Sequence, residues 1–215
     1  MDFNEANEIL QNFSGEKLSS TISRIENELM ETDVYNIYNK YNINDDLVKV
    51  AIKVKELSSK INIILHSVAI LKCLPLILKQ DEVIENISLG AGNTGKEFDL
   101  ETNRRVAEFK FIFWRGGSES IRQNSIFKDF FGLAEDESNK EKYLYVLSTD
   151  HVVKFLESNR SMNSILSRNV GLKSKFETIY GDKIMYIREY YEIKKNIVKI
   201  KDVSKIVFDE PLRLR

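Results

Sequence analysis

The sequence predicts an α/β protein in which helices pack on a mixed β-sheet. Three observations lead to this prediction. Residues 1–80 place apolar side chains at helical spacings, and residues 106–113 alternate in the period of a strand. The elements then follow in the order helix, three strands, helix, strand, helix, which is an arrangement of helical layers on a sheet. The 215 residues, 42% hydrophobic and 30% charged, suit one folded soluble core with appended elements.

Residues 1–80 are predicted to be helical. Apolar residues recur there at spacings of three and four: Leu18, Ile22, Ile25 and Leu29; Val34, Ile37, Tyr38 and Tyr41; Leu47, Val50, Val54, Leu57 and Ile61. The most apolar stretch, from Ile61 to Leu78, contains several polar residues, whereas a membrane span needs about 20 mostly apolar ones. We therefore expect a buried helix that Pro75 kinks or ends, and no membrane partner.

After residue 80 the pattern becomes that of strands joined to helices. The predicted elements are a strand at Val83–Leu89, a hairpin of Glu97–Thr102 and Arg105–Phe113, a helix from Ser120, a strand at Tyr143–Leu147, a helix from Asp150 and a late strand at Ile197–Ile200. Ser120 and Gln123 have the spacing of a capping box. Ile126, Phe127, Phe130 and Phe131 form the apolar stripe of that helix.

Charge is distributed unevenly, although the net charge is only -1. Residues 1–50 carry ten acidic and four basic side chains, whereas residues 151–215 carry fourteen basic and eight acidic ones. A basic C-terminal third suits a polyanionic partner, and a solvated surface is the alternative interpretation. The single cysteine, Cys73, forms no internal disulfide, and the N-terminus lacks the pattern of a signal peptide, so we expect a cytoplasmic protein.

Residues Gly90–Lys96 match two nucleotide-binding motifs in part. GAGNTG fits the dinucleotide fingerprint, and with Lys96 it fits most of a phosphate-binding loop. Glu97, however, replaces the serine or threonine that holds magnesium in that loop. Both motifs also need a helix to begin there, whereas the following residues alternate like a strand. A nucleotide-binding enzyme therefore remains an alternative prediction, and a tight turn between strands is the preferred one.

The predicted hairpin brings chemically useful side chains together. With Asn103 and Arg104 as its loop, Asp99 lies opposite Glu108, with Cβ atoms about 5 Å apart. Lys110 follows Glu108 on the same face. Paired carboxylates repel each other unless a cation lies between them, and hard oxygen ligands suit Mg²⁺ or Mn²⁺. Such a set can hydrolyse a phosphodiester, and a purely structural charge cluster is the alternative.

Asp99 followed by Glu108-Phe109-Lys110 on the next strand resembles the active-site motif of the PD-(D/E)XK nuclease superfamily. The resemblance covers residues 83–156 and extends to the order of the elements. It implies a restriction-endonuclease-like fold and a metal-dependent nuclease, expected to be an endonuclease acting on DNA. It also implies that Asp99, Glu108 and the Phe109 carbonyl bind the metal, and that Lys110 is catalytic.

The sequence departs from the family motif at one position, and the resemblance does not settle which residues support the site. Phe98 stands where the name-giving proline would be. Members often add an acid from the helix before the sheet, for which Glu56 is the candidate, with Glu82 and Glu85 nearer in sequence. On that helix, His66 is expected to be a buried histidine with satisfied hydrogen bonds. Gln123 resembles a glutamine that some members place after the lysine strand, and its capping-box role explains it equally well.

The resemblance divides the chain into three parts. Residues 1–80 form a helical extension packing on the core, residues 81–160 the nuclease core, and residues 161–215 a basic C-terminal extension of the same domain. The N-terminal helical extension is expected either to cover the sheet or to form the interface of a homodimer. Five basic residues are candidates for nucleic-acid contacts: Arg104, Arg105, Arg115, Arg122 and Lys128. The remaining alternative is a nuclease-like protein that binds nucleic acid without cutting it.

Overall fold

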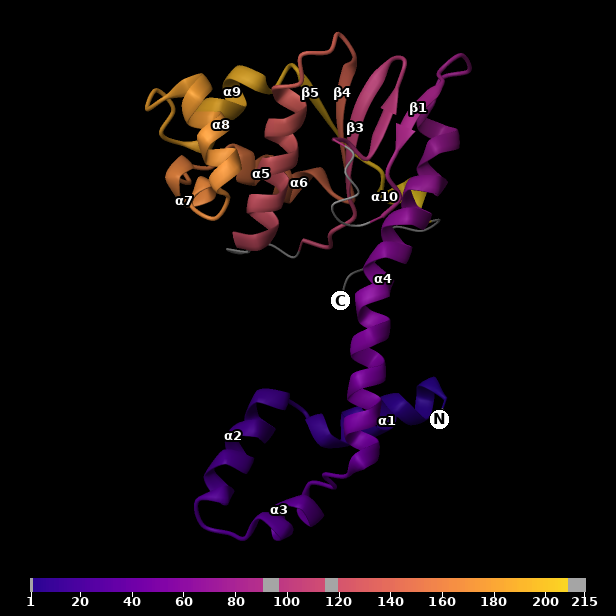
Figure 1. Ribbon diagram of the computed structural model, residues 1–215, viewed down its shortest axis with the longest axis vertical. Coiled ribbons are helices and arrows are strands. Elements are labelled where there is room, and N and C mark those ends of the chain that lie inside the picture. Colours follow the sequence, from indigo (N-terminus) through magenta and orange to yellow (C-terminus); the bar gives the residue numbers. More distant parts are fainter. Residues whose placement is uncertain (1, 91–96, 115–119, 209–215) are drawn as a thin grey trace. The chain divides into compact units, whose positions relative to one another are not determined.

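The computed structural model describes residues 2–90, 97–114 and 120–208 (Figure 1). It divides into two compact units, Met1–Asn62 and Ile63–Arg215. The boundary lies inside the longest helix, whereas the sequence placed it near residue 80. In order, the elements are α1 Phe3–Ser14, α2 Leu18–Leu29, α3 Val34–Lys40, α4 Asp45–Ile77, β1 Ile84–Ile87, β2 Leu100–Thr102, β3 Arg105–Lys110, α5 Ser120–Ala134, β4 Glu141–Val146, α6 Thr149–Leu156, α7 Met162–Leu166, α8 Val170–Tyr180, α9 Ile187–Lys194, β5 Val198–Asp202 and α10 Ser204–Val207.

The first unit consists of α1, α2, α3 and the N-terminal part of α4. Asp2 and Asp33 cap α1 and α3 by accepting hydrogen bonds from the backbone N–H groups of Glu5 and Tyr35. Only a small core forms here, with four buried side chains among the described residues: Thr21, Ile25, Ile37 and Val50. Most of the apolar positions that predicted these helices are therefore partly exposed.

The second unit is built on a five-stranded mixed sheet in the order β1-β2-β3-β4-β5. β1, β2 and β3 pair antiparallel, whereas β3, β4 and β5 pair parallel. The predicted α/β class and mixed sheet are thus confirmed. The late strand predicted at Ile197–Ile200 is also confirmed as β5, so the C-terminal region completes the sheet.

Each face of the sheet buries its own hydrophobic cluster. Helices α5 to α9 cover one face, where Val106, Leu144 and Val146 pack against the aromatic stripe of α5. The C-terminal part of α4 and the short α10 cover the other face, where Phe109 and Phe111 are buried. Period two explains this division, because Ala107, Phe109 and Phe111 point away from Glu108 and Lys110.

Helix α4 differs from the expected buried helix. It continues past Pro75 to Ile77, and its Ala69, Ile70 and Cys73 are buried against the sheet. The rest of its apolar surface is largely exposed. By length and composition alone it is the one helix among the described residues that qualifies as a candidate membrane span, with a mean hydropathy of 1.6. Only 17% of that apolar window is buried, and a single helix of this kind is weak evidence for a membrane span.

Candidate active site

The β2–β3 hairpin has the predicted register. Leu100 pairs with Ala107 and Glu101 with Val106, so the next step of the ladder brings Asp99 to Glu108. Asp99 lies one residue before β2, and its Oδ2 accepts a hydrogen bond of 2.9 Å from the backbone N–H of Phe109. A side-chain hydrogen bond joins Asp99 and Glu108. The hairpin therefore brings the two predicted acids together.

Lys110 lies on the same face as Glu108, and both face α5. From that helix Asp129 reaches the sheet, with its Oδ2 2.5 Å from the Lys110 Nζ. The Asp129 side chain is only 9% exposed. Asp129 was not among the residues predicted from the sequence, although the sequence contains a signal for it. Asp129 interrupts the buried stripe of Ile126, Phe130 and Leu133, where an acid needs a partner.

The two paired acids, Asp99 and Glu108, have pKa values that are shifted in opposite directions. Burial raises the pKa of Glu108, the charges of Asp129 and Asp99 add to this, and the value reaches about 10. Burial also disfavours a charged Asp99. Hydrogen bonds from His66 and the Phe109 N–H outweigh it and hold the pKa of Asp99 below its usual range. The two shifts act in opposite directions, so Glu108 is the member of the pair that holds a proton more readily.

Lys110 is held in its charged form. Burial disfavours an ammonium, but the charge and hydrogen bond of Asp129 outweigh it and raise the pKa of Lys110. The Lys110 ammonium thus places a positive charge within the acidic cluster, and an ammonium cannot coordinate a metal. Its position is set by α5 as well as by its own strand.

An acid from the helix before the sheet was expected beside Asp99, and the residue of α4 that lies there is His66. Its Nε2 lies 3.4 Å from Asp99 Oδ1, and its ring packs edge-on against Phe111 at 5.8 Å between centroids. The His66 side chain is only 14% exposed, as expected for a largely buried histidine, and the carboxylate of Asp99 is the polar partner of its Nε2. Glu56 belongs to the first unit, whereas Asp99 and Glu108 belong to the second, and its supporting role stays a prediction.

The two nearer acids have structural partners instead. Glu82 is buried against Arg105, and Glu85 pairs with Lys140 at 2.6 Å. Gln123 lies in the first turn of α5, and its Oε1 is buried without a hydrogen-bond partner in the described chain. The expected capping box with Ser120 is therefore absent from the described contacts, and the supporting role predicted for Gln123 stays a prediction.

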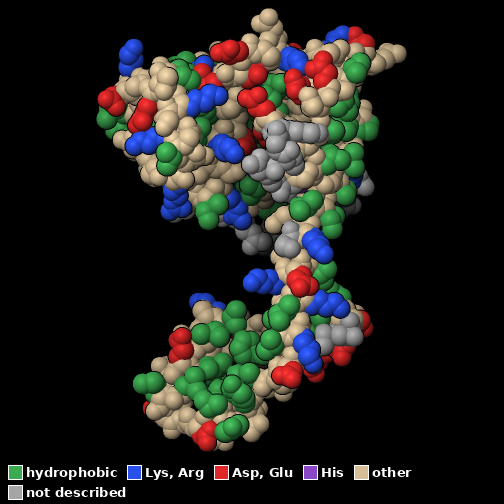
Figure 2. Space-filling view, in the orientation of Figure 1, with side chains coloured by type: hydrophobic (Ala, Val, Ile, Leu, Met, Phe, Trp, Pro, Cys, Tyr) green, Lys and Arg blue, Asp and Glu red, His purple; other side chains and the backbone are tan. Residues whose placement is uncertain are grey.

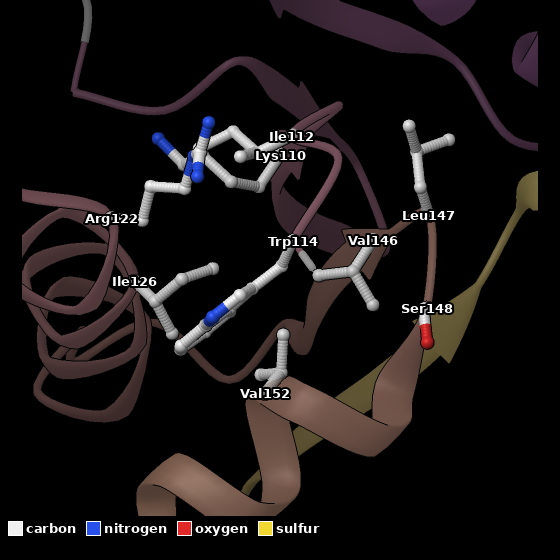
Figure 3. Close-up of a pocket in the computed structure, with 9 residues that line it drawn as sticks. All are labelled: Lys110, Ile112, Trp114, Arg122, Ile126, Val146, Leu147, Ser148 and Val152. Carbon is white, nitrogen blue, oxygen red and sulfur yellow. The ribbon is translucent and has the colours of Figure 1, made fainter. Parts of the chain in front are cut away.

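A small cleft adjoins Lys110 (Figure 3). Its wall is formed by the end of β3, the first turns of α5 and the end of β4, and it is lined by Lys110, Ile112, Trp114, Arg122, Ile126, Val146, Leu147, Ser148 and Val152. Figure 3 shows the Trp114 ring between Ile126 and Val152, with Lys110 and Arg122 at one end of the cleft. Two basic side chains thus border an opening beside the acidic cluster.

The basic residues predicted to contact nucleic acid occupy different environments. The assignment of Arg105 is wrong, because its side chain is 4% exposed and pairs with Glu82 and with the Tyr145 hydroxyl. Arg104 lies at the surface in an ion pair with Asp81. Lys128 is exposed on α5, Arg122 borders the cleft, and Arg115 lies outside the described residues.

The glycine-rich segment lies largely outside the described residues, which resume at Glu97. From Glu97 to Asp99 the backbone bends, and β2 begins at Leu100. A phosphate-binding loop needs a helix directly after it. A strand follows instead, so this part of the chain does not support the nucleotide-binding alternative.

The proton on Glu108 predicts an unusual dependence of stability on pH. The folded-state pKa, about 10, lies above the ordinary value of 4.5, so the stabilisation from proton binding is full below pH 4.5 and is lost as the pH rises toward 10. We expect Glu108→Gln to remove this loss. It should stabilise the metal-free protein by on the order of 2 kcal/mol at pH 7, and by more at pH 9.

Urea unfolding at pH 5, 7 and 9 with a chelator present measures this difference. Glu97→Gln, an exposed acid near the same hairpin, is the matched control and should follow the wild type at each pH. A difference between Glu108→Gln and wild type that is constant across the three pH values would contradict the assigned proton.

Comparisons of this chain with models of protein families, with curated proteins and with solved structures find no match.

Proposed function

We propose that this protein is a metal-dependent nuclease of the PD-(D/E)XK type with a restriction-endonuclease-like core. Its expected reaction is endonucleolytic hydrolysis of DNA phosphodiester bonds. The observation that carries the proposal is the convergence of Asp99, Glu108 and Lys110 from the β2–β3 hairpin. Two acids and a lysine in one buried cluster are costly for stability, so a catalytic role accounts for their presence better than a structural one.

The donor set suits Mg²⁺ or Mn²⁺. Among the described residues no three His, Cys, Asp or Glu side chains converge on one point, so the protein would supply two carboxylates, Asp99 and Glu108. Magnesium is commonly bound by one or two carboxylates together with water and substrate phosphate. The Phe109 carbonyl is the proposed further ligand. Repulsion from Asp99 and Asp129 contributes to the raised pKa of Glu108, and a cation bound by the two carboxylates would relieve that repulsion.

Each residue of the cluster has a defined part in the proposed reaction. A bound divalent cation polarises a phosphate oxygen and lowers the pKa of a coordinated water. Asp99 and Glu108 would hold that cation, with Glu108 giving up its proton. Lys110 would stabilise the negative charge that develops in the transition state. Asp129 would position the Lys110 ammonium from α5, and Arg122 would attract phosphate at the edge of the cleft.

A cleavage assay tests the proposal directly. Supercoiled plasmid, single-stranded DNA and RNA are incubated with the full chain in Mg²⁺, in Mn²⁺ and in EDTA. We expect cleavage with either metal, none with EDTA, and a preference for DNA. Binding of DNA without cleavage of any substrate would favour the non-catalytic alternative, and neither binding nor cleavage would refute both.

Binding should depend strongly on salt. If Arg122, Lys128 and other surface bases contact phosphates, binding releases condensed counterions, and affinity falls steeply as salt rises. Fluorescence anisotropy with a labelled duplex in Ca²⁺, from 50 to 200 mM salt, should show a loss of about tenfold or more. Affinity that is independent of salt would count against a nucleic-acid substrate.

A further inference from the structure

Helix α4 carries two apolar faces, and among the described residues only one of them packs against another part of the chain. His66, Ile70 and Cys73 lie on the face that packs against the sheet. On the opposite face, six residues follow spacings of three and four without a break: Val54, Leu57, Ile61, Ile64, Val68 and Leu71. We call this row the α4 seam. Each member is between 36% and 59% exposed.

The spacing of the α4 seam suits one particular kind of partner. Alternating intervals of three and four are the heptad pattern, which matches a second helix packed alongside in a coiled coil. Leu47 and Val50 extend the same register to the start of α4, although Val50 is buried in the first unit. The exposed seam runs for about 25 Å at 1.5 Å per residue. Figure 2 shows other hydrophobic side chains gathered on the N-terminal helices.

We propose that the α4 seam pairs with the same seam of a second copy of this chain, forming a parallel two-stranded coiled coil. The residue types at the two seam positions support this state. Val54, Ile61 and Val68 fall at the a positions, and Leu57, Ile64 and Leu71 fall at d, so every a position is β-branched and two of the three d positions are leucine. β-Branched residues at a with leucine at d favour parallel dimers. The inference does not depend on the proposed nuclease activity.

The charges that flank the seam support the parallel direction. Lys53 and Lys60 occupy g positions, and a parallel partner would place Ser58 and Leu65 opposite them, which are uncharged. An antiparallel partner would bring g positions together and oppose lysine to lysine. Like charges at close range are destabilising, so the parallel pairing is the compatible one.

A membrane is a poorer occupant of the same face. The uncharged stretch between Lys60 and Lys72 is only eleven residues long, and it includes the polar residues Asn62 and Ser67. A helical span needs about 20 mostly apolar residues. The Ser67 hydroxyl also lies 2.6 Å from the Leu89 carbonyl and 2.8 Å from the Ile63 carbonyl, and the hydrogen bond to Leu89 ties this segment to the folded unit.

Sedimentation equilibrium of the full chain tests the pairing with two adjacent isoleucines. Ile64 lies on the seam and is 58% exposed, whereas Ile63 lies beside it, off the seam, and is 44% exposed. We expect the wild type and Ile63→Lys to be dimers at tens of micromolar. Ile64→Lys should weaken dimerisation by about tenfold or more, because a lysine would be buried at d. Equal effects of the two substitutions, or a monomeric wild type, would overturn the proposal.

Cross-linking tests the direction. Cys73 is buried, so a cysteine introduced by Leu57→Cys is the accessible thiol. In a parallel coil the two copies of position 57 face each other, within reach of a disulfide. We expect mild oxidation to cross-link the variant, and a stable dimer that does not cross-link would refute the parallel arrangement. A monomer that binds vesicles of phosphatidylcholine and phosphatidylglycerol, with binding lost in Ile64→Lys, would instead assign the seam to a membrane surface.

Discussion

Asp99→Ala, Glu108→Ala and Lys110→Ala should each reduce magnesium-dependent cleavage by on the order of a thousandfold. The two acids are expected to act by holding the metal, whereas Lys110 stabilises the transition state. The three substitutions should therefore differ in metal binding. Magnesium should raise the unfolding temperature of the wild type and of Lys110→Ala, and have little effect on either acid variant, because an ammonium is not a metal ligand.

The buried ion pair gives this series an internal check. Lys110→Ala leaves Asp129 buried without its counter-charge, so the variant should be less stable than the wild type in the absence of metal. Lys173→Ala, an exposed lysine on α8, should retain wild-type cleavage and stability. Wild-type cleavage by Lys110→Ala, or the same magnesium response in all variants, would show that the cluster is structural.

Most of the sheet was predictable from local patterns. The alternation of Val106 to Lys110 and the two-residue loop at Asn103 fixed the register of the hairpin, and the structure has that register. Strand ends were less accurate, since β3 ends at Lys110 and the predicted strand ended at Phe113. The alternating pattern of β3 continues past Lys110, which is the last residue of β3 that pairs with β4. Alternation within one strand does not reveal where its pairing with a neighbouring strand ends.

The site was predictable only where its members are close in sequence. Asp99, Glu108 and Lys110 come from one hairpin, so spacing brings them together. Asp129 and His66 approach from helices on opposite faces of the sheet, and those contacts depend on tertiary packing. Local patterns contain no information about which residue of α4 or α5 faces the hairpin, apart from the anomaly of an acid in an apolar stripe.

The interpretation of Arg105 failed for a related reason. Arg104 and Arg105 are adjacent in sequence and were both predicted to contact phosphate. The start of β3 turns Arg104 toward the surface and Arg105 into the sheet, where Glu82 accepts its guanidinium hydrogen bonds. The alternation of a strand predicts that neighbours point oppositely, but the sequence did not reveal that the inward position held an acid partner.

Arg105→Ala should destabilise the second unit by about 3–5 kcal/mol. Glu82 would remain buried, because its carboxylate has no exposed surface and also accepts hydrogen bonds from the Thr102 hydroxyl and the Lys79 N–H. Unfolding by denaturant, followed by Trp114 fluorescence, reports on this unit because Trp114 is the only tryptophan.

Two further variants separate the buried charge from the loss of side-chain packing. Arg104→Ala removes the neighbouring surface pair and should cost less than about 1 kcal/mol. Arg105→Met combined with Glu82→Leu removes both buried charges while keeping apolar volume, and should recover most of the stability lost in Arg105→Ala, because an unpaired charge costs more than the pair contributes. If Arg105→Ala were as stable as Arg104→Ala, the buried pair would have no structural role.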